Sequence, residues 1–287
     1  MAILLVDSYS LLFRAHYALP PMSTSEGEPT GALYGVSLLL LKLLREERPE
    51  GVAFALDAPG GTFRHDVAPS YKAGRARVDE ALLQQLGRFD ELVAALGVPA
   101  HRVPGFEADD LLASLASRLE APAVIVSGDR DLFQCVGPRV EVLFTGRRGG
   151  PQERYDLAAI DARYGVAPRQ LPSVTALVGD PADNLPKVEG VGIKTACRWV
   201  REHGDVAGVL SAAASLKPAG AAAALVAVAD LVRQSEVLGT RRCDVPLGEP
   251  LHGPITDAGL DALAALFAAL EFGSLLPRLD KLRADQR

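Results

Sequence analysis

Four short and almost wholly apolar runs are the clearest pattern along the chain. They are found at 2–6, 51–56, 123–128 and 140–144. Such runs are typical of strands buried on both faces of a parallel sheet. Amphipathic segments of helical length lie between them, at 11–18, 31–47 and 82–96. Strands that alternate with helices predict a mostly parallel, doubly wound α/β sheet.

The second half of the chain has a different pattern. Its apolar spacing predicts helices only, at 156–164, 168–178, 195–203, 206–214, 219–238 and 257–270. The Ala-rich run within 219–229 has high helix propensity. We therefore expect an α/β core over 1–155 and a helical region over 156–287, integrated into one domain.

Composition narrows the class of protein. Hydrophobic residues make up 48% and charged residues 23% of the 287 residues, as in an ordinary globular chain. The net charge of −6 argues against a generally basic nucleic-acid binder, but it leaves room for a local basic face. Three scattered cysteines without zinc spacing predict a reducing compartment. We find no signal peptide or long apolar run, and so expect a cytoplasmic location without a membrane partner.

Acidic residues gather where the predicted elements end. Residues 104–116 read as a loop and a helix start, with Glu107 and Asp110 on one face and Asp109 to the side. Six more aspartates stand at the ends of other elements: Asp7, Asp57, Asp129, Asp131, Asp180 and Asp183. Any one of these acids, taken alone, can be a turn residue, an N-cap or a partner of a helix dipole.

Taken together, the acids favour a cation site. Open α/β sheets place their sites at the carboxyl ends of strands, so these side chains are expected to meet. A cluster of carboxylates repels itself at neutral pH unless cations lie within it, and hard oxygen ligands suit Mg²⁺ or Mn²⁺.

A basic segment interrupts the pattern between residues 60 and 80. It combines cations with aromatic residues: Phe63, Arg64, His65, Tyr71, Lys72, Arg75 and Arg77. One interpretation is a solvated surface loop. The other is a segment that contacts phosphates, with aromatic rings available to stack on bases. A second basic stretch, at 147–150, reads as a turn.

The stretch 179–196 separates two predicted helices. Gly190 and Gly192 allow a tight turn that exposes backbone N–H groups at the start of the next helix. The turn can be a plain helix–helix connection. It can also hold a phosphate without reading base sequence.

Four stretches of this sequence together resemble the 5′-nuclease (flap endonuclease) family, and most closely the type of 5′→3′ exonuclease domain found at the N-terminus of bacterial DNA polymerase I. They are LLVDSYSLLFRAHYAL at 4–19, FRHDVAPSYKAGR at 63–75, PGFEADDLLASLA at 104–116 and GDPADNLPKVEGVGIKTA at 179–196. SGDRDLFQ at 127–134 and LEFGSLL at 270–276 extend the resemblance over essentially the whole chain. It implies a PIN-like core with a helical arch at about 60–85 and a helix-hairpin-helix motif.

The resemblance also implies roles for individual residues. The ligands nearer the attacking water would be Asp7, Asp57, Glu107 and Asp109, with Asp110 as an accessory carboxylate. The second group of ligands would be Asp129, Asp131, Asp180 and Asp183. Lys72 and Arg75 would contact the scissile phosphate. The expected DNA contacts are Arg14, Arg64, Tyr71, Arg77, Gly190, Gly192, Lys194 and Thr195, the last four in a hairpin where the family often binds K⁺.

The expected activity is structure-specific 5′ nuclease action that requires two or more Mg²⁺ or Mn²⁺ ions, about 3.5–4 Å apart when paired. The expected partner is DNA with 5′ flaps, nicks or 5′ ends, including RNA-primed ones, bound by a monomer in bacterial replication and repair. The chain departs from the family at Ser8, where Gly is usual, and at Lys187, where Gly also is usual. The first could narrow the space beside the metals, and the second adds charge where duplex is expected.

Two alternatives remain open at this point. A ribonuclease of the PIN type shares the acidic core but normally lacks the 179–196 hairpin and the 63–77 segment. A non-catalytic junction-binding protein needs the hairpin but not the acids. Since no polymerase segment is seen, we expect either a stand-alone nuclease or one domain of a longer protein.

Overall fold

The computed structural model describes residues 2–75, 78–146 and 152–286. Arg77 and the predicted basic turn at 147–150 lie outside the described residues. Within them, one sheet has the strand order β3-β2-β1-β4-β5-β6. Its members are β1 (Ile3–Asp7), β2 (Gly51–Ala55), β3 (Ala100–His101), β4 (Ala123–Ser127), β5 (Val140–Phe144) and β6 (Glu153–Tyr155).

The sheet is mostly parallel, as predicted. Strands β1 to β5 pair in parallel, and β6 pairs with β5 in the antiparallel sense. The four predicted strands are all present. The sequence analysis missed β3 and β6, which have only 2 and 3 residues. Strands this short carry no detectable alternation of apolar and polar side chains.

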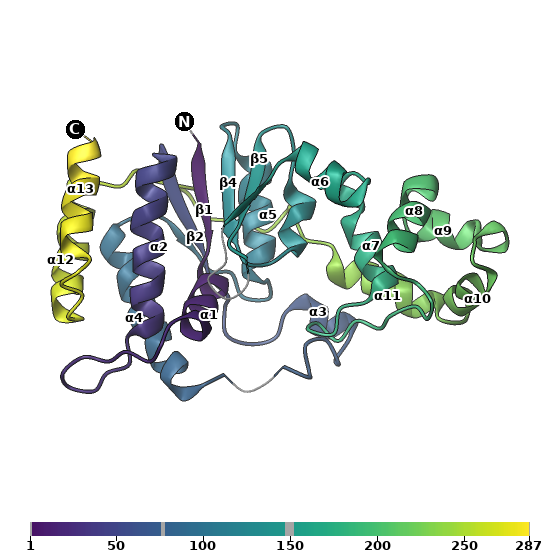
Figure 1. The fold of residues 1–287 in the computed structure, drawn as a ribbon, viewed down its shortest axis with the longest axis horizontal. Helices are drawn as coiled ribbons and strands as arrows, with labels where there is room; N and C mark the ends of the chain where they lie inside the picture. Colours follow the sequence, from purple (N-terminus) through teal and green to yellow (C-terminus); the bar gives the residue numbers. More distant parts are fainter. Residues whose placement is uncertain (1, 76–77, 147–151, 287) are drawn as a thin grey trace.

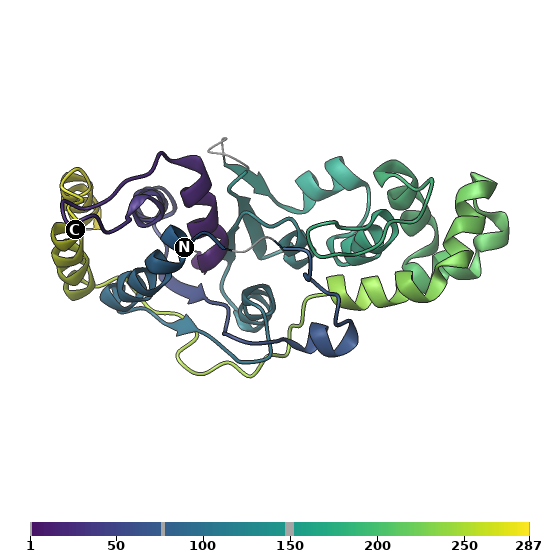
Figure 2. The same cartoon turned by 90° about the horizontal axis from the view of Figure 1, so that it is seen from below.

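The two faces of the sheet bury alternate residues of the same strands, as the pleat requires. Leu4, Val6 and Phe54 pack against one helical layer. That layer consists of α1 (Ser8–Ala18), α2 (Gly31–Glu47) and α4 (Glu80–Leu96). Helices α12 (Asp257–Ala269) and α13 (Leu276–Gln286) pack outside it, against α4 and α2. Ile3 and Leu5 face the opposite side, which is covered first by α5 (Ala108–Arg118). Figure 2 looks from the end where the parallel strands finish and shows helices on both sides of the sheet.

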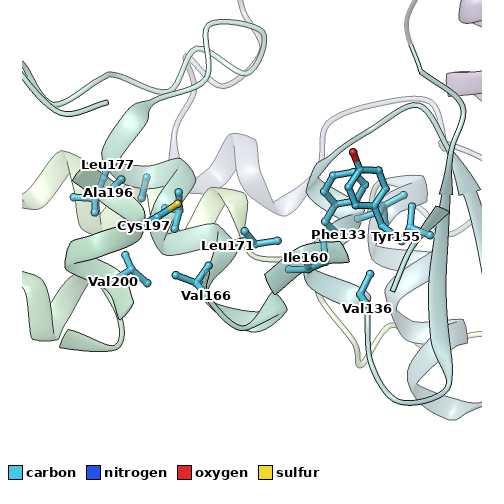
Figure 3. Packing of buried hydrophobic residues seen from close by; sticks show 14 of the residues in the cluster. Phe133, Val136, Tyr155, Ile160, Val166, Leu171, Leu177, Ala196, Cys197 and Val200 are labelled. Carbon is cyan, nitrogen blue, oxygen red and sulfur yellow. The ribbon is translucent and has the colours of Figure 1, made fainter. Parts of the chain in front are cut away.

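The helical region extends beyond the β6 edge of the sheet (Figure 1). It contains α6 (Leu157–Tyr164), α7 (Leu171–Val178), α8 (Ile193–His203), α9 (Val206–Ser211), α10 (Ala219–Ala227) and α11 (Ala229–Gly239), with the 3₁₀ turns η2 (Pro168–Gln170) and η3 (Ala213–Ser215). A further 3₁₀ turn, η1 (Asp131–Cys135), follows β4 in the α/β core. One apolar cluster joins the two parts of the molecule. It runs from Phe133 and Tyr155, whose rings stack at 4.2 Å, through Leu171 to Cys197 and Val200 on α8 (Figure 3).

Two predicted helices differ from the structure. The segment 219–238 is divided into α10 and α11 at Val228, which has φ −118° and ψ 22°. High helix propensity favours helix along the whole run, but α11 packs against α7 whereas α10 packs against η3, so packing overrides propensity. The segment 206–214 ends as a helix at Ser211 and continues as η3. Helix α13 was not predicted.

The predicted arch has little helix in its described part. Between residues 60 and 79 the described helix is α3 (Phe63–Val67), and residues 69–74 form turns. The segment lies along the carboxyl ends of the strands, on the lower side of the molecule in Figure 1. It therefore faces the edge where the predicted acidic residues lie.

Candidate active site

The sheet brings three of the predicted aspartates to one edge. Asp7 is the last residue of β1, and Asp57 and Asp129 each stand two residues beyond the ends of β2 and β4. Strands β2 and β4 both pair with β1 in parallel, so their carboxyl ends are neighbours. The chain proceeds from β1 to β2 and β3 on one side and then crosses to β4 on the other side of β1, so the topological switch point lies between the carboxyl ends of β1 and β4.

Helix α5 adds its acidic start to this edge. Asp57 accepts a hydrogen bond from the backbone N–H of Ala108 at 2.8 Å, which docks the first turn of α5 against the end of β2. Glu107 is the N-cap residue of α5, and Asp109 follows in its first turn. The carboxylate of Asp57 thus satisfies a free N–H of the helix while the helix delivers Glu107 and Asp109 beside it.

The second group of acids is carried by turns. Asp131 lies in η1, and Asp180 and Asp183 lie in the turn that follows α7. That turn is closed by two backbone hydrogen bonds between Asp180 and Leu185, at 3.1 and 2.8 Å. Asp183 is buried, with 6% of its surface exposed, and Asp180 is half-buried.

The basic segment is attached to both acidic groups. Lys72 Nζ lies 2.7 Å from Glu107, and Arg75 Nη2 lies 2.9 Å from Asp183. The Lys72 backbone N–H donates to the Asp183 carbonyl at 3.2 Å, and Lys72 itself adopts φ +58°. The left-handed conformation is uncommon for a residue with a side chain. It turns the segment so that Lys72 and Arg75 contact different acidic groups.

Burial and mutual repulsion shift the pKa values of several acids upward. Burial raises the pKa of Asp7 to about 7, with Asp57 and Asp129 adding to the shift against a hydrogen bond from Ser127. Burial raises the pKa of Asp131 to about 6, although the nearby Arg241 opposes it. Burial likewise raises the pKa of Asp109 well above its usual range. Negative charge in this cluster is therefore incompletely neutralised by the protein itself.

Within the described residues, no three His, Cys, Asp or Glu side chains converge closely enough to form a preformed metal site. The carboxylates stay apart because they accept hydrogen bonds from different donors. Asp7 accepts from Ser127, Asp57 accepts from Ala108 N–H, and Glu107 accepts from Lys72. The hard oxygen donors and their unneutralised charge nonetheless fit Mg²⁺ or Mn²⁺.

Arg241 is a buried cation in this cluster that the sequence analysis missed. Its side chain is 2% exposed and contacts three carboxylates, those of Glu107, Asp109 and Asp131. It follows α11 in a stretch without a recognised motif, more than a hundred residues from each of its partners. No local sequence signal places a residue so distant in the chain at the metal ligands.

Asp110 is separated from the other acids by its partners. Its two oxygens accept hydrogen bonds from Arg64 at 2.6 and 2.8 Å, and Oδ1 also accepts the backbone N–H of Arg242 at 2.9 Å. Burial opposes ionisation, but these donors outweigh it and lower the pKa of Asp110. Both Asp110 oxygens thus already accept hydrogen bonds, and a role as accessory metal ligand stays a prediction.

Two residues that are expected to contact DNA are buried in this structure, so their contact with DNA stays a prediction. Arg64 is fully buried, paired with Asp110, and it donates to the carbonyls of Leu238 and Thr240. Tyr71 is 2% exposed, and its hydroxyl donates to Asp183 at 2.9 Å and to Glu107 at 3.3 Å. A basic or aromatic residue in a polar segment suggests the surface, but here both side chains point inward to satisfy buried acids.

The hairpin connects α7 to α8 as predicted. Gly190 adopts φ +74° and packs closely on Ala221, where a Cβ would lie 3.3 Å from the alanine methyl. Gly192 is the N-cap of α8 and lacks a side-chain cap, Lys194 is exposed, and Thr195 is half-buried. Arg14 lies apart from the hairpin on α1, where it lines a surface pocket with Lys42 and Arg278. Contacts of these residues with DNA stay predictions.

Comparison with known proteins agrees with this architecture. The family of the 5′-3′ exonuclease N-terminal resolvase-like domain matches residues 2–165, and that of the 5′-3′ exonuclease C-terminal SAM fold matches residues 166–257. A thermostable DNA polymerase I of Thermus thermophilus is 39% identical over 287 residues, which cover 98% of this chain and 34% of that protein. The chain thus spans about a third of the length of such relatives.

Solved structures give the same fold. T5 5′-exonuclease with bound zinc superposes with a TM-score of 0.66 and 24% identity, covering 99% of this chain and 98% of that one. The catalytic core of Rad2 in complex with DNA substrate gives 0.62 and 15% identity, covering 99% and 90%. The two family matches together extend over most of the sequence. The chain therefore belongs to the 5′-3′ exonuclease family, whose members are hydrolases acting on DNA.

Proposed function

We propose that this protein is a divalent-metal-dependent 5′ nuclease that removes 5′ ends and 5′ flaps from DNA. One observation carries the proposal: two groups of carboxylates meet at the switch point of the sheet, and one basic segment contacts both. Hydrolysis of a phosphodiester needs cations on the phosphate oxygens and an activated water, and this is the one place in the described residues where the predicted residues for both tasks lie together.

The proposed ligands form the two groups described above. Asp7, Asp57, Glu107 and Asp109 would hold one Mg²⁺ or Mn²⁺ ion, and Asp129, Asp131, Asp180 and Asp183 would hold a second. Such ions, when bound, supply a water of lowered pKa and charge stabilisation at the leaving oxygen. Asp110 and Arg64 would instead position the α5 start. The choice between Mg²⁺ and Mn²⁺ belongs to the proposal.

Lys72 and Arg75 would change partners during the reaction. In the structure they form ion pairs with Glu107 and Asp183. Glu107 and Asp183 are proposed metal ligands, and cations on them would leave Lys72 and Arg75 available to contact the scissile phosphate. Fixed cations at the developing negative charge stabilise the transition state more than the ground state. Tyr71, which contacts Glu107 and Asp183, would keep the segment docked during this exchange.

The hairpin would bind the duplex without reading its sequence. Exposed backbone N–H groups at the start of α8 and the exposed Lys194 suit a phosphate, and the family resemblance adds K⁺ at this turn. The terminal nucleotides must then unpair to reach the carboxylates, at a cost of a few kcal/mol that is smaller at a flap or nick. Selectivity would thus depend on nucleic-acid structure.

The proposal also covers the location, oligomeric state, substrates and domain division of the protein. We expect a cytoplasmic monomer that acts on DNA and RNA-primed 5′ ends, and we expect the division at 155/156 to separate a catalytic part from a duplex-binding part. No described helix has the length and apolar character needed to cross a bilayer.

One assay tests the function directly. End-labelled 5′-flap, nicked and blunt duplexes are incubated with the protein and Mg²⁺, with EDTA as the blank. We expect short 5′ products from the flap and nicked substrates, and fewer from the blunt duplex. A parallel flap made of RNA separates DNA from RNA preference. Full activity in EDTA, or no cleavage of any substrate with Mg²⁺ or Mn²⁺, would contradict the proposal.

A further inference from the structure

The stretch that carries Arg241 is fixed from two sides. The Arg241 backbone N–H donates to Gln134 at 2.9 Å, and the next N–H, that of Arg242, donates to Asp110 at 2.9 Å. Arg64 donates to the preceding carbonyl, that of Thr240, at 3.1 Å. Arg64 and Asp110, which also position the start of α5, therefore hold the backbone on either side of Arg241. A side chain held in this way is directed into the carboxylate cluster by the fold.

The guanidinium of Arg241 bridges the two acidic groups. Its Nη1 lies 3.5 Å from Glu107 and its Nε lies 3.5 Å from Asp109, both in the first group. Its Nη2 donates to Asp131, in the second group. Among the described residues, Nε is buried and has no hydrogen-bond partner. One cation thus contacts carboxylates that the proposed function assigns to two different metal ions.

We propose that Arg241 is a resident cation that competes with the divalent ion of the second group for Asp131. The inference rests on the proposed metal ligands. A divalent ion and a guanidinium both bind carboxylate oxygens, and one oxygen cannot be fully engaged by both at once. The ion of the second group binds only when Arg241 releases Asp131, so its affinity is weaker than the carboxylates alone would give. Without metal, Arg241 limits the repulsion between the two groups.

Arg242 provides a matched control within the same stretch. It is adjacent in sequence and carries the same charge, but its side chain is turned to the surface, where it pairs with Asp244 at 2.6 Å. Arg241→Gln and Arg242→Gln therefore remove the same formal charge from neighbouring positions. Only the first of them removes a contact with the proposed metal ligands.

The test is calorimetric titration of the DNA-free protein with Mn²⁺, together with thermal unfolding in EDTA. We expect Arg241→Gln to tighten the weaker Mn²⁺ site by at least about tenfold, as for competing ligands in one site. We expect it to lower the melting temperature in EDTA by roughly 3 °C or more. Arg242→Gln should change neither quantity, and Arg241→Lys should lie between wild type and Arg241→Gln. In an Asp131→Asn background the effect of Arg241→Gln on Mn²⁺ affinity should largely vanish.

Each result decides between the interpretations. If Arg241→Gln is unfolded in EDTA but folds when Mn²⁺ is added, the ion has replaced the lost cation and the inference holds. If it stays unfolded with Mn²⁺, Arg241 is a structural residue and the inference is wrong. Equal Mn²⁺ affinity in wild type and a folded Arg241→Gln protein also overturns it. A wild-type protein that binds no Mn²⁺ would instead contradict the proposed function itself.

Discussion

The sheet edge and the end of the hairpin, at 190–195, both present groups that suit phosphate chemistry, but they are built differently. At the edge, Asp7 and Asp109 have raised pKa values, and Lys72 contacts Glu107 from a distant segment. The hairpin is exposed, and it offers backbone N–H groups and Lys194. The difference suggests a division of labour, in which the edge performs chemistry and the hairpin provides affinity. The predictions below test this division.

The largest effect is expected for Asp57→Asn. The substitution removes a proposed ligand while keeping the shape of the side chain, so the rate should fall by about 10³ or more. Binding of flap DNA, measured by fluorescence anisotropy in Ca²⁺, should change little. Asp161→Asn, an exposed position on α6, serves as the control. Undiminished cleavage by the Asp57 variant would show that the carboxylates at the sheet edge do not take part in catalysis.

Lys72→Ala and Arg75→Ala should each slow single-turnover cleavage of a flap substrate at saturating enzyme. A cation that stabilises the transition state is typically worth ~2.7–4 kcal/mol, and we expect at least a roughly tenfold loss in rate with a smaller change in Kd. If either variant regains the wild-type rate once the enzyme is saturated, that residue only steers DNA toward the site, and it belongs with the hairpin.

The metal-free protein should become less stable as pH rises from about 4 to 7. Asp7 has a folded pKa of about 7 and Asp131 one of about 6, both raised by burial above the usual 3.8. The folded state therefore retains protons that the unfolded chain has lost, so the free energy of unfolding falls as pH rises through this window. Asp110 and Asp183 have lowered pKa values, so their stabilisation is lost only below about pH 4.

Urea unfolding in EDTA at pH 5 and pH 8 measures this dependence. Adding Mn²⁺ should flatten it, because bound cations favour the ionised carboxylates. Neither of the two acids whose raised pKa values define this pH window belongs to the hairpin. A metal-free protein that is more stable at pH 8 than at pH 5 would show that the acids at the edge are already neutralised.

The smallest effect is expected for Lys194→Ala. It should weaken binding to all duplex substrates about equally and reduce the slope of log K against log salt by roughly one unit. The single-turnover rate at saturation should stay at the wild-type value. A loss confined to one base sequence would mean that the hairpin reads bases, and a slower saturated rate would mean that it contributes to chemistry.

The sequence was most informative where short-range rules apply. Three of the four long strands end at, or shortly before, Asp7, Asp57 and Asp129, so parallel pairing alone predicts that these acids meet. The resemblance supplied the hairpin. Burial of single side chains could not be predicted, because it depends on long-range packing. Arg64 and Tyr71 belong to a polar segment, yet both are buried against distant acids. Arg241 lies 110 residues from Asp131 and had no motif to mark it.

The division of 219–238 had a similar cause. Its composition favours one long helix, and only packing against different neighbours explains the break at Val228. The short strands β3 and β6 were missed for the opposite reason, since they depend on pairing with stronger strands and have no pattern of their own. Local sequence preference predicts a helix or strand well when it agrees with the tertiary structure, and poorly when packing or pairing with other elements determines the conformation.

The backbone of Lys72 has a consequence for anyone who sets out to engineer a more heat-resistant protein. Its φ of +58° disfavours any residue with a Cβ by about 1 kcal/mol relative to glycine, and Asn tolerates it better than most. A screen for thermostability alone would therefore enrich Gly or Asn at this position and discard the ammonium group. Selection for melting temperature and selection for turnover would therefore favour different residues at position 72. Such a conflict is typical of functional sites, where backbone strain is tolerated because it positions a residue needed for activity.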